Sequence, residues 1–270
     1  DGPEGRLYEA MRYAALAPGK RFRSILVLAG ADIFDVPRRS SLRAAAAVEL
    51  VHTYSLVHDD LPCMDDGETR RGQPATHVRF DEATAVLAGD ALLPLAFQVL
   101  ARKETHGDPG VRLELVTALA QAAGAHGMAG GQMIDLIAEK SPRSDVATIT
   151  RLQQLKTGAL ITFSCEAGAI LGHATPNIRH AVRAFSHDLG LAFQMTDDLL
   201  DVEGSQKRLG KGVQRDTRAG KATFIAALGP DRARSQAGML VEQAVEHLDA
   251  FGAKSDFLRQ LARFAVRRDA

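Results

Sequence analysis

Helical periodicity runs along almost the whole chain and leaves little room for any other kind of element. Apolar residues recur at intervals of three and four rather than two, and alanine-rich stretches such as 44–47 favour helix over strand. Proline and glycine interrupt this pattern. The spacing predicts helices over 4–17, 21–34, 39–60, 79–102, 109–139, 144–172, 176–203, 230–249 and 255–267. The sequence therefore predicts an all-α fold.

The bulk composition is that of a globular protein without a strong overall charge. Of the 270 residues 46% are hydrophobic, and 33 basic residues balance 33 acidic ones. A balanced charge gives no global field that would recruit nucleic acid or a membrane surface. No apolar run approaches the roughly 18 to 20 residues of a membrane span, and two cysteines cannot build a disulfide framework. We expect a cytoplasmic protein without membrane insertion, built as one domain over 1–270.

The most informative chemistry lies in two clusters of aspartates. In the second cluster, Gln194, Asp197, Asp198 and Asp201 follow i, i+3, i+4, i+7 spacing and form one stripe on an otherwise apolar helix. Such a narrow stripe indicates the polar lining of a cavity, although a solvated acidic face gives the same pattern. Mg²⁺ typically takes one or two protein carboxylates and completes its shell with water and substrate phosphate.

The first cluster, residues 59–66, ends a helix just before Pro62. Asp59 and Asp60 then lie at a helix C-terminus, where the helix dipole disfavours negative charge unless a cation binds. His52 lies two turns earlier on nearly the same face, although a lone histidine there is more often a core residue. Two such clusters that face each other would hold a phosphorylated substrate between them.

Basic residues beside glycines complement the acidic clusters. Gly19, Lys20 and Arg23 surround the start of a helix, where free backbone N–H groups favour an anion. Arg70 and Arg71 follow the first acidic cluster, and arginine offers a planar fork for phosphate oxygens. Taken singly, each of these cations is better explained as a solvated surface residue.

In combination the motifs resemble those of the short-chain trans-prenyltransferases, most of all the bacterial farnesyl diphosphate synthases. The chain carries, in the family order, Gly-Lys-Arg-x-Arg, Val-His-Asp-Asp-Leu-Pro-x-Met-Asp-Asp, Arg-Arg-Gly, Gly-Gly-Gln-x-x-Asp-Leu, Leu-Lys-Thr-Gly-Ala-Leu, Phe-Gln-x-x-Asp-Asp-Leu-Leu-Asp and Gly-Lys-Ala-Thr-Phe. The resemblance covers residues 5–270, and the family's earliest helical segment is expected upstream of Asp1. It implies one helical bundle around a central cavity.

The resemblance also implies roles for individual residues. The implied metal ligands are Asp59, Asp65, Asp197 and Asp201, with Asp198 in support. The implied contacts to isopentenyl diphosphate are Gly19, Lys20, Arg23, His52 and Arg71. Those to the allylic diphosphate are Arg70, Lys156, Thr157, Gln194, Lys211 and Lys221, of which Arg70, Lys156, Thr157 and Gln194 are also expected to assist catalysis. Phe22, Ser24 and Gln214 depart from the family pattern.

The implied reaction is a head-to-tail condensation by a homodimer. Mg²⁺, three ions in the family pattern with Mn²⁺ as an alternative, would assist ionisation of dimethylallyl or geranyl diphosphate, and isopentenyl diphosphate would attack the allylic cation. Tyr54 and Ser55 would limit the product mainly to farnesyl diphosphate, although Tyr54 is also explained as a core aromatic. The alternatives are a geranylgeranyl diphosphate synthase, a terpene cyclase and a non-catalytic synthase subunit. A cyclase needs no second diphosphate site, and a non-catalytic subunit would be expected to lose an acidic motif.

Overall fold

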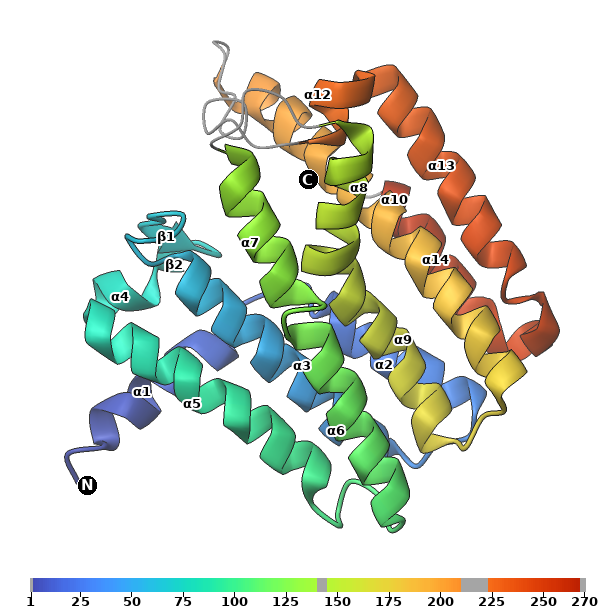
Figure 1. Ribbon diagram of the computed structural model, residues 1–270, viewed down its shortest axis with the longest axis horizontal. Helices are drawn as coiled ribbons and strands as arrows, with labels where there is room; N and C mark the ends of the chain where they lie inside the picture. The colour runs from blue at the N-terminus through green and yellow to red at the C-terminus, as the bar shows by residue number, and fades with distance from the viewer. Residues whose placement is uncertain (1, 140–144, 210–222, 268–270) are drawn as a thin grey trace. The chain divides into compact units, whose positions relative to one another are not determined.

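The computed structural model describes residues 2–139, 145–209 and 223–267, which fold almost entirely into helices (Figure 1). The longer helices are α1 (Gly5–Leu16), α2 (Phe22–Ile33), α3 (Arg38–Asp59), α5 (Glu82–Ala101), α6 (Pro109–Ala123), α7 (Met128–Glu139), α8 (Val146–Gln153), α9 (Ala159–Leu171), α10 (Pro176–Leu209), α13 (Pro230–Glu246) and α14 (Asp256–Arg267). The shorter elements are β1 (Thr69–Arg70), β2 (Gln73–Pro74), α4 (Thr76–Arg79), the π-helical turn η1 (Gln154–Gly158), α12 (Phe224–Leu228) and the 3₁₀ helix η2 (Asp249–Ser255). The predicted all-α fold is confirmed.

The chain divides into two compact units. Unit 1 comprises residues 1–28 and 37–116, and unit 2 comprises residues 29–36 and 117–270. In unit 1, α3 packs along α5, and α1 packs against both. Asp81 caps the N-terminus of α5, accepting a hydrogen bond from the Thr84 amide at 2.7 Å and another from Arg6 of α1 at 2.7 Å. The hydrogen bond from the Thr84 amide has the largest effect and that from Arg6 the next, and they lower the pKa of Asp81 to about 2.

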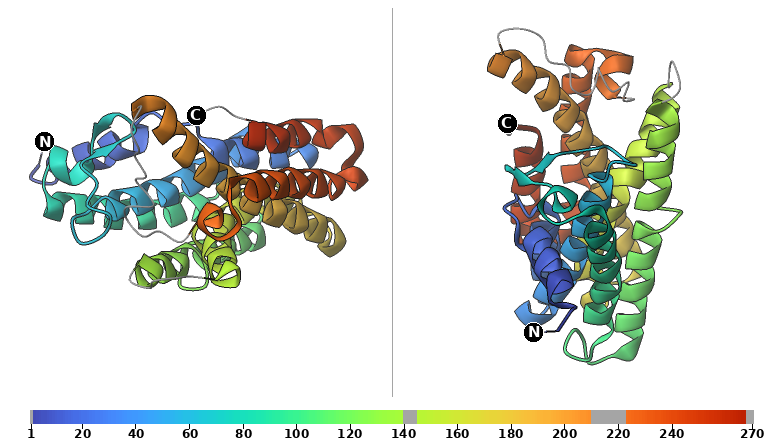
Figure 2. Two further views of the ribbon diagram at one scale, coloured as in Figure 1. Left: turned by 90° about the horizontal axis from the view of Figure 1, so that it is seen from above. Right: turned by 90° about the vertical axis from the view of Figure 1, so that its left-hand side faces the viewer.

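Unit 2 is organised around α10, which packs against α9, α13 and α14. Figure 2 shows α13 and α14 beside one another. A core cluster joins α8, α10, α12 and α13 through Ile149, Leu191, Met195, Phe224 and Ala237, all buried. Burial of these apolar side chains fixes the face that α10 turns inward, and with it the direction of its polar stripe.

Two of the predicted helices are interrupted. The segment 109–139 breaks between α6 and α7, where the Gly127 amide donates to the Gly124 carbonyl at 2.9 Å. A Cβ at Gly127 would lie 2.2 Å from the Ala122 carbonyl oxygen, so the turn requires glycine. The segment 144–172 contains η1, whose wider turn does not follow the 3.6-residue period used to predict helices.

The loop after the first acidic cluster forms a short hairpin, whereas the sequence predicted no strand. Its turn residues, Arg71 and Gly72, have φ of 54° and 77°. Positive φ at both central residues is the geometry of the tightest hairpin turns. Strands of two residues are too short to display an alternating pattern, which explains why this hairpin was not predicted.

Among the described residues, α5 is the one helix long and apolar enough to cross a membrane by length and composition, with a mean hydropathy of 1.6 over its most apolar window. Asp90 and Pro94 interrupt this segment, so it is not a continuous apolar run. Only 33% of that window is buried. A single helix of this kind is weak evidence for a span, but α5 leaves the apolar side chains of Val86 and Leu87 exposed, next to the exposed Asp90.

Candidate active site

The first acidic cluster forms a tight loop in unit 1. Helix α3 ends at Asp59, with Asp60 as its C-cap, as the position of Pro62 predicted. The Asp65 amide donates to the Asp59 carbonyl at 2.8 Å, and the Gly67 amide donates to the Asp60 carbonyl at 3.1 Å. The chain thus folds back on itself and brings the backbones of Asp59 and Asp65, the two predicted metal ligands of this cluster, into contact.

Asp60 has a different environment from Asp59. Its side chain is buried, and Arg70 donates to it through Nε at 3.1 Å and through Nη2 at 2.5 Å. Burial acts to lower the pKa of Arg70, but the hydrogen bond to Asp60 and the nearby carboxylates outweigh it and raise that pKa. Arg70, predicted to contact the allylic diphosphate, is therefore engaged by Asp60, a residue for which the sequence suggested no separate role.

His52 lies among arginines in the same unit. Its Nε2 is 3.4 Å from Nη1 of Arg23. Burial, followed by the charges of Arg23, Arg71, Arg70 and Arg21, lowers the pKa of His52 well below its usual value. The imidazole is therefore neutral at pH 7, and the surrounding guanidinium groups supply the positive charge. Such an arrangement suits a polyanion such as a diphosphate.

The remaining residues of this basic cluster are close by. The guanidinium of Arg71 lies against Gly19, where an added Cβ would come within 2.8 Å of Cζ and the end of the Arg71 side chain would have to shift. Lys20 is exposed immediately before α2. Arg21 is instead held by Glu49 at 3.1 Å. Glu49 was not predicted as part of this cluster, although its position three residues before His52 places the two on one face of α3.

The two predicted chain-length residues lie in the last turns of α3. Tyr54 contacts His58 edge-on, with ring centroids 5.8 Å apart. Burial, followed by the charge of Asp59, raises the pKa of Tyr54. The Ser55 hydroxyl donates to the His52 carbonyl at 2.9 Å. Their role in setting product length stays a prediction.

In unit 2, the predicted lysine and threonine both lie on η1. Nζ of Lys156 donates to Oδ2 of Asp135 on α7 at 2.5 Å, and Asp135 is buried. The backbone of η1 packs closely against α7 at Gly131. A Cβ at that position would lie only 2.2 Å from the Lys156 backbone nitrogen. π-helical turns inside α-helices are frequent at functional sites. The Gly-Gly-Gln-x-x-Asp motif thus supports the turn that carries Lys156.

The acidic stripe on α10 divides into separate environments. The Thr157 hydroxyl donates to Gln194 at 3.0 Å, and the Gln194 amide donates to Asp198 at 3.0 Å. Asp198 is buried and also accepts from the Phe224 amide at 2.9 Å, which ties α12 to α10. Asp197 is only partly buried and Asp201 is exposed. The sequence spacing alone did not distinguish the buried carboxylate of Asp198 from those of Asp197 and Asp201, which reach solvent.

The donor set fits a metal whose coordination is completed by substrate. No group of three or more His, Cys, Asp or Glu side chains within residues 2–139, 145–209 and 223–267 is arranged as a ready metal cage. Mg²⁺ seldom needs one, because it accepts one or two carboxylates and fills its other positions with water and phosphate oxygen. Asp59 and Asp65 in unit 1, and Asp197 and Asp201 in unit 2, offer such hard oxygen donors. Lys211 and Lys221 lie outside the described residues.

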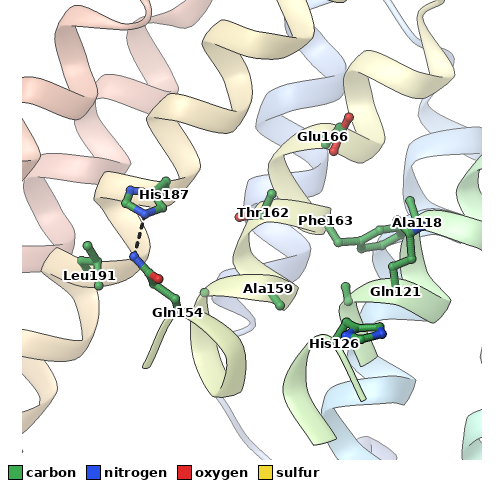
Figure 3. A pocket seen from close by; sticks show the side chains of 12 residues that line it. Ala118, Gln121, His126, Gln154, Ala159, Thr162, Phe163, Glu166, His187 and Leu191 are labelled. Atoms are coloured by element: carbon green, nitrogen blue, oxygen red, sulfur yellow. Dashed lines mark hydrogen bonds between the residues drawn. The ribbon is translucent and has the colours of Figure 1, made fainter. Parts of the chain in front are cut away.

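Unit 2 also contains a cleft of about 250 Å³ beside η1 (Figure 3). Gln154 and Gly158 of η1 and His187 and Leu191 of α10 contribute to its walls. None of the predicted substrate residues lines it. The size of this cleft therefore does not identify the site, and the case for the predicted residues depends on their own contacts.

Comparison with known proteins points to one family. The family model for polyprenyl synthetases matches residues 4–257. Farnesyl diphosphate synthase of Escherichia coli is 40% identical over 269 residues, covering 97% of this chain and 89% of the relative. Geranylgeranyl diphosphate synthase of Cyanophora paradoxa is 36% identical over 263 residues, covering 97% and 88%. The apo crystal structure of an FPP/GFPP synthase from Zymomonas mobilis is 52% identical, covers 98% of this chain and 90% of its own, and superimposes with a TM-score of 0.90.

Proposed function

Because the chain belongs to the polyprenyl synthetase family, we propose that it is a prenyltransferase of the farnesyl diphosphate synthase type. It condenses isopentenyl diphosphate head-to-tail with dimethylallyl or geranyl diphosphate. The allylic C–O bond ionises, the double bond of isopentenyl diphosphate attacks the allylic cation, and a proton then passes to the released diphosphate. No protein nucleophile takes part.

One observation carries this proposal against the alternatives, namely the arginines that surround His52. Arg23 is 3.4 Å from the imidazole, and the charges of Arg21, Arg70 and Arg71 also act on it. This basic cluster supports a diphosphate site separate from the acidic stripe of α10. A terpene cyclase acts on one diphosphate substrate and has no use for a second site. A non-catalytic subunit would be expected to have lost one acidic motif, whereas both are present.

The cluster around His52 binds isopentenyl diphosphate, with Gly19, Lys20, Arg23 and Arg71 as its contacts. The neutral imidazole acts as a hydrogen-bonding group, and the guanidinium groups supply the positive charge that binds the anion. Lys156 and Thr157 on η1 and Gln194 on α10 bind and orient the allylic substrate. Lys156 donates to Asp135, Thr157 to Gln194 and Gln194 to Asp198, and these hydrogen bonds hold the three side chains in place before substrate binds.

Asp59 and Asp65 in unit 1 and Asp197 and Asp201 in unit 2 are the proposed metal ligands. When bound, Mg²⁺, three ions in the family pattern, supplies the positive charge that stabilises the departing diphosphate. The protein contributes hard oxygen donors and, in Arg70, a cation beside the acidic loop. Asp60 and Asp198 are assigned to structural hydrogen bonds instead.

We propose farnesyl diphosphate as the main product, with Tyr54 as the floor of the chain-length cavity. Ser55 lies one turn before Asp59 but is too small to stop a growing chain, whereas its neighbour Tyr54 is large enough. The similarity to a geranylgeranyl diphosphate synthase supports the longer product as the second candidate. The variant Tyr54→Ala should then lengthen the product to about twenty carbons or more, which product mass spectra read directly; an unchanged product would place the floor elsewhere.

A homodimer in the cytoplasm completes the proposal. On α5, Leu87 is 56% exposed and Val86 39%, in a helix of high mean hydropathy. Burying such a face against a second copy removes apolar surface from water, and obligate homodimer interfaces are of this kind. Cys63 and Cys165 are free thiols, as expected in a reducing compartment.

The variant Arg23→Ala tests the assignment of the isopentenyl diphosphate site. Loss of a charge-assisted hydrogen bond to phosphate costs about 1.5–3 kcal/mol, which corresponds to roughly a ten- to hundredfold rise in the KM for isopentenyl diphosphate. The KM for geranyl diphosphate should change far less. Initial-rate kinetics with each substrate varied in turn give both constants. An equal rise in the two would mean that Arg23 does not distinguish the substrates.

A further inference from the structure

The π-helical turn η1 is tied to α10 by side chains at both of its ends. Near its C-terminal end the Thr157 hydroxyl donates to Gln194 at 3.0 Å. At the other end, Nε2 of Gln154 lies 2.8 Å from Nε2 of His187, and Figure 3 shows this pair beside the cleft. The backbones also approach each other at the last residue of the turn, since a Cβ at Gly190 would be 3.3 Å from the Gly158 Cα. His187 therefore contacts the first residue of the turn that carries the proposed allylic-site residues.

The π-helical conformation of this turn is unusual. It is rare, and it is found mainly as a single turn inserted within an α-helix. Lys156 and Thr157 lie in the middle of this turn, between Gln154 and Gly158. A shift of Gln154 would therefore move both functional side chains relative to α10.

His187 is exposed, but its ring contacts a buried carboxylate. Its Nδ1 is 3.2 Å from Oδ1 of Asp188, and Oδ2 of the same carboxylate is 3.1 Å from Nε2 of His247, the C-cap of α13. Asp188 is buried, with 6% of its surface exposed. Oδ1 of Asp188 thus lies on the Nδ1 side of the ring, and Nε2 of His187 faces the Gln154 amide.

We propose that His187, oriented by Asp188, is a positioning residue for the allylic diphosphate. It fixes Gln154 and through Gln154 the turn that presents Lys156 and Thr157. The inference rests on the proposed function, because it takes Lys156 and Thr157 as contacts of the allylic substrate. His187 itself touches no substrate.

Three variants of α10 test the inference. His187→Ala removes the hydrogen bond to Gln154, His187→Gln keeps both a donor and an acceptor, and His180→Ala changes an exposed histidine two turns earlier on the same helix. His187→Ala should raise the KM for geranyl diphosphate about three- to tenfold, the effect of losing one hydrogen bond. The KM for isopentenyl diphosphate should stay within about twofold, as the geometry confines the change to the allylic side. His187→Gln should restore most of the loss, and His180→Ala should behave as wild type.

Calorimetric titration with inorganic diphosphate and Mg²⁺ gives a second reading that does not need turnover. His187→Ala should bind the diphosphate more weakly than His187→Gln or His180→Ala. An unchanged KM for geranyl diphosphate in His187→Ala, or an equal rise for both substrates, would overturn the inference. If the wild-type protein condenses no substrates, the proposed function fails, and the order of the calorimetric affinities still decides whether His187 positions a diphosphate site.

Discussion

At His52, burial and neighbouring charge act in the same direction. An imidazole in a buried position loses the hydration that stabilises its protonated form, and Arg23 and Arg71 add repulsion. The folded protein therefore keeps His52 neutral at pH values where the unfolded chain would protonate it. The positive charge that this cluster offers to a diphosphate therefore comes from the arginines, and the imidazole offers a hydrogen-bonding group.

This shift predicts a stability that falls on acidification. The pKa of His52 is lower in the folded state than the ordinary value of about 6.5, so below that value the unfolded chain binds more protons. Stability is therefore lost as the pH falls, by up to about 1.4 kcal/mol per pH unit from this one group. Urea unfolding at pH 7.5 and pH 5.5 should show a smaller loss in His52→Gln than in wild type. Equal losses would show that His52 does not titrate in this way.

The position of a functional side chain could be predicted only where it depends on residue spacing within one helix. The i, i+3, i+4, i+7 pattern correctly placed Gln194, Asp197, Asp198 and Asp201 on one helix. It could not show that Asp198 is buried by α12, because that contact depends on Phe224, which is 26 residues away in the chain. The Arg70 to Asp60 pair was missed for a similar reason, since a tight turn brings Arg70 back to the end of α3.

Among the secondary-structure elements, η1 depends most on a close backbone approach. Gly131 on α7 admits the backbone of Lys156, and any Cβ there would lie 2.2 Å from the Lys156 nitrogen. Backbone atoms cannot rotate away as a side chain can, so the turn itself would have to move. Overpacking of this kind typically costs about 1–3 kcal/mol.

The variant Gly131→Ala should therefore reduce stability and lower kcat/KM for the allylic substrate at least about tenfold, since both functional residues of η1 shift. Gly238→Ala is the matched control. Gly238 lies within α13, and a Cβ added there would have nothing within 4 Å, so the same change should stabilise by about 0.5–1 kcal/mol. Thermal melts and initial rates measure both effects. Wild-type activity in Gly131→Ala would contradict the proposed support of η1.

Most helices were predictable from periodicity because their apolar faces are buried within each unit. The start of α2, the end of α3 and the length of α14 agree with the predictions to within one or two residues. The breaks at Gly127 and at η1 were not predicted, because apolar spacing continues across both. The hairpin formed by β1 and β2 depends on positive φ at Arg71 and Gly72, which composition alone does not indicate.

For the whole molecule, the uncovered face of α5 predicts self-association. Leu87→Glu places a charge on that face and should convert a dimer into a monomer, because an unpaired carboxylate is costly to bury in an apolar interface. Met239→Glu is the control. Met239 is 63% exposed but belongs to α13, a different helix from α5. Size-exclusion chromatography with light scattering gives the masses. A Leu87→Glu dimer would show that the interface lies elsewhere.

The most direct test of the proposed condensation is product analysis with the wild-type protein. Purified enzyme is incubated with Mg²⁺, labelled isopentenyl diphosphate and, separately, dimethylallyl or geranyl diphosphate, and the chain length is read by mass spectrometry. The variants Asp59→Ala and Asp197→Ala serve as paired controls, one from each unit, and should lose turnover by orders of magnitude while keeping their helical content. We expect incorporation of isopentenyl diphosphate and a main product of fifteen carbons that depends on both aspartates. Conversion of the allylic diphosphate without incorporation of isopentenyl diphosphate, or full activity in either variant, would contradict the proposal.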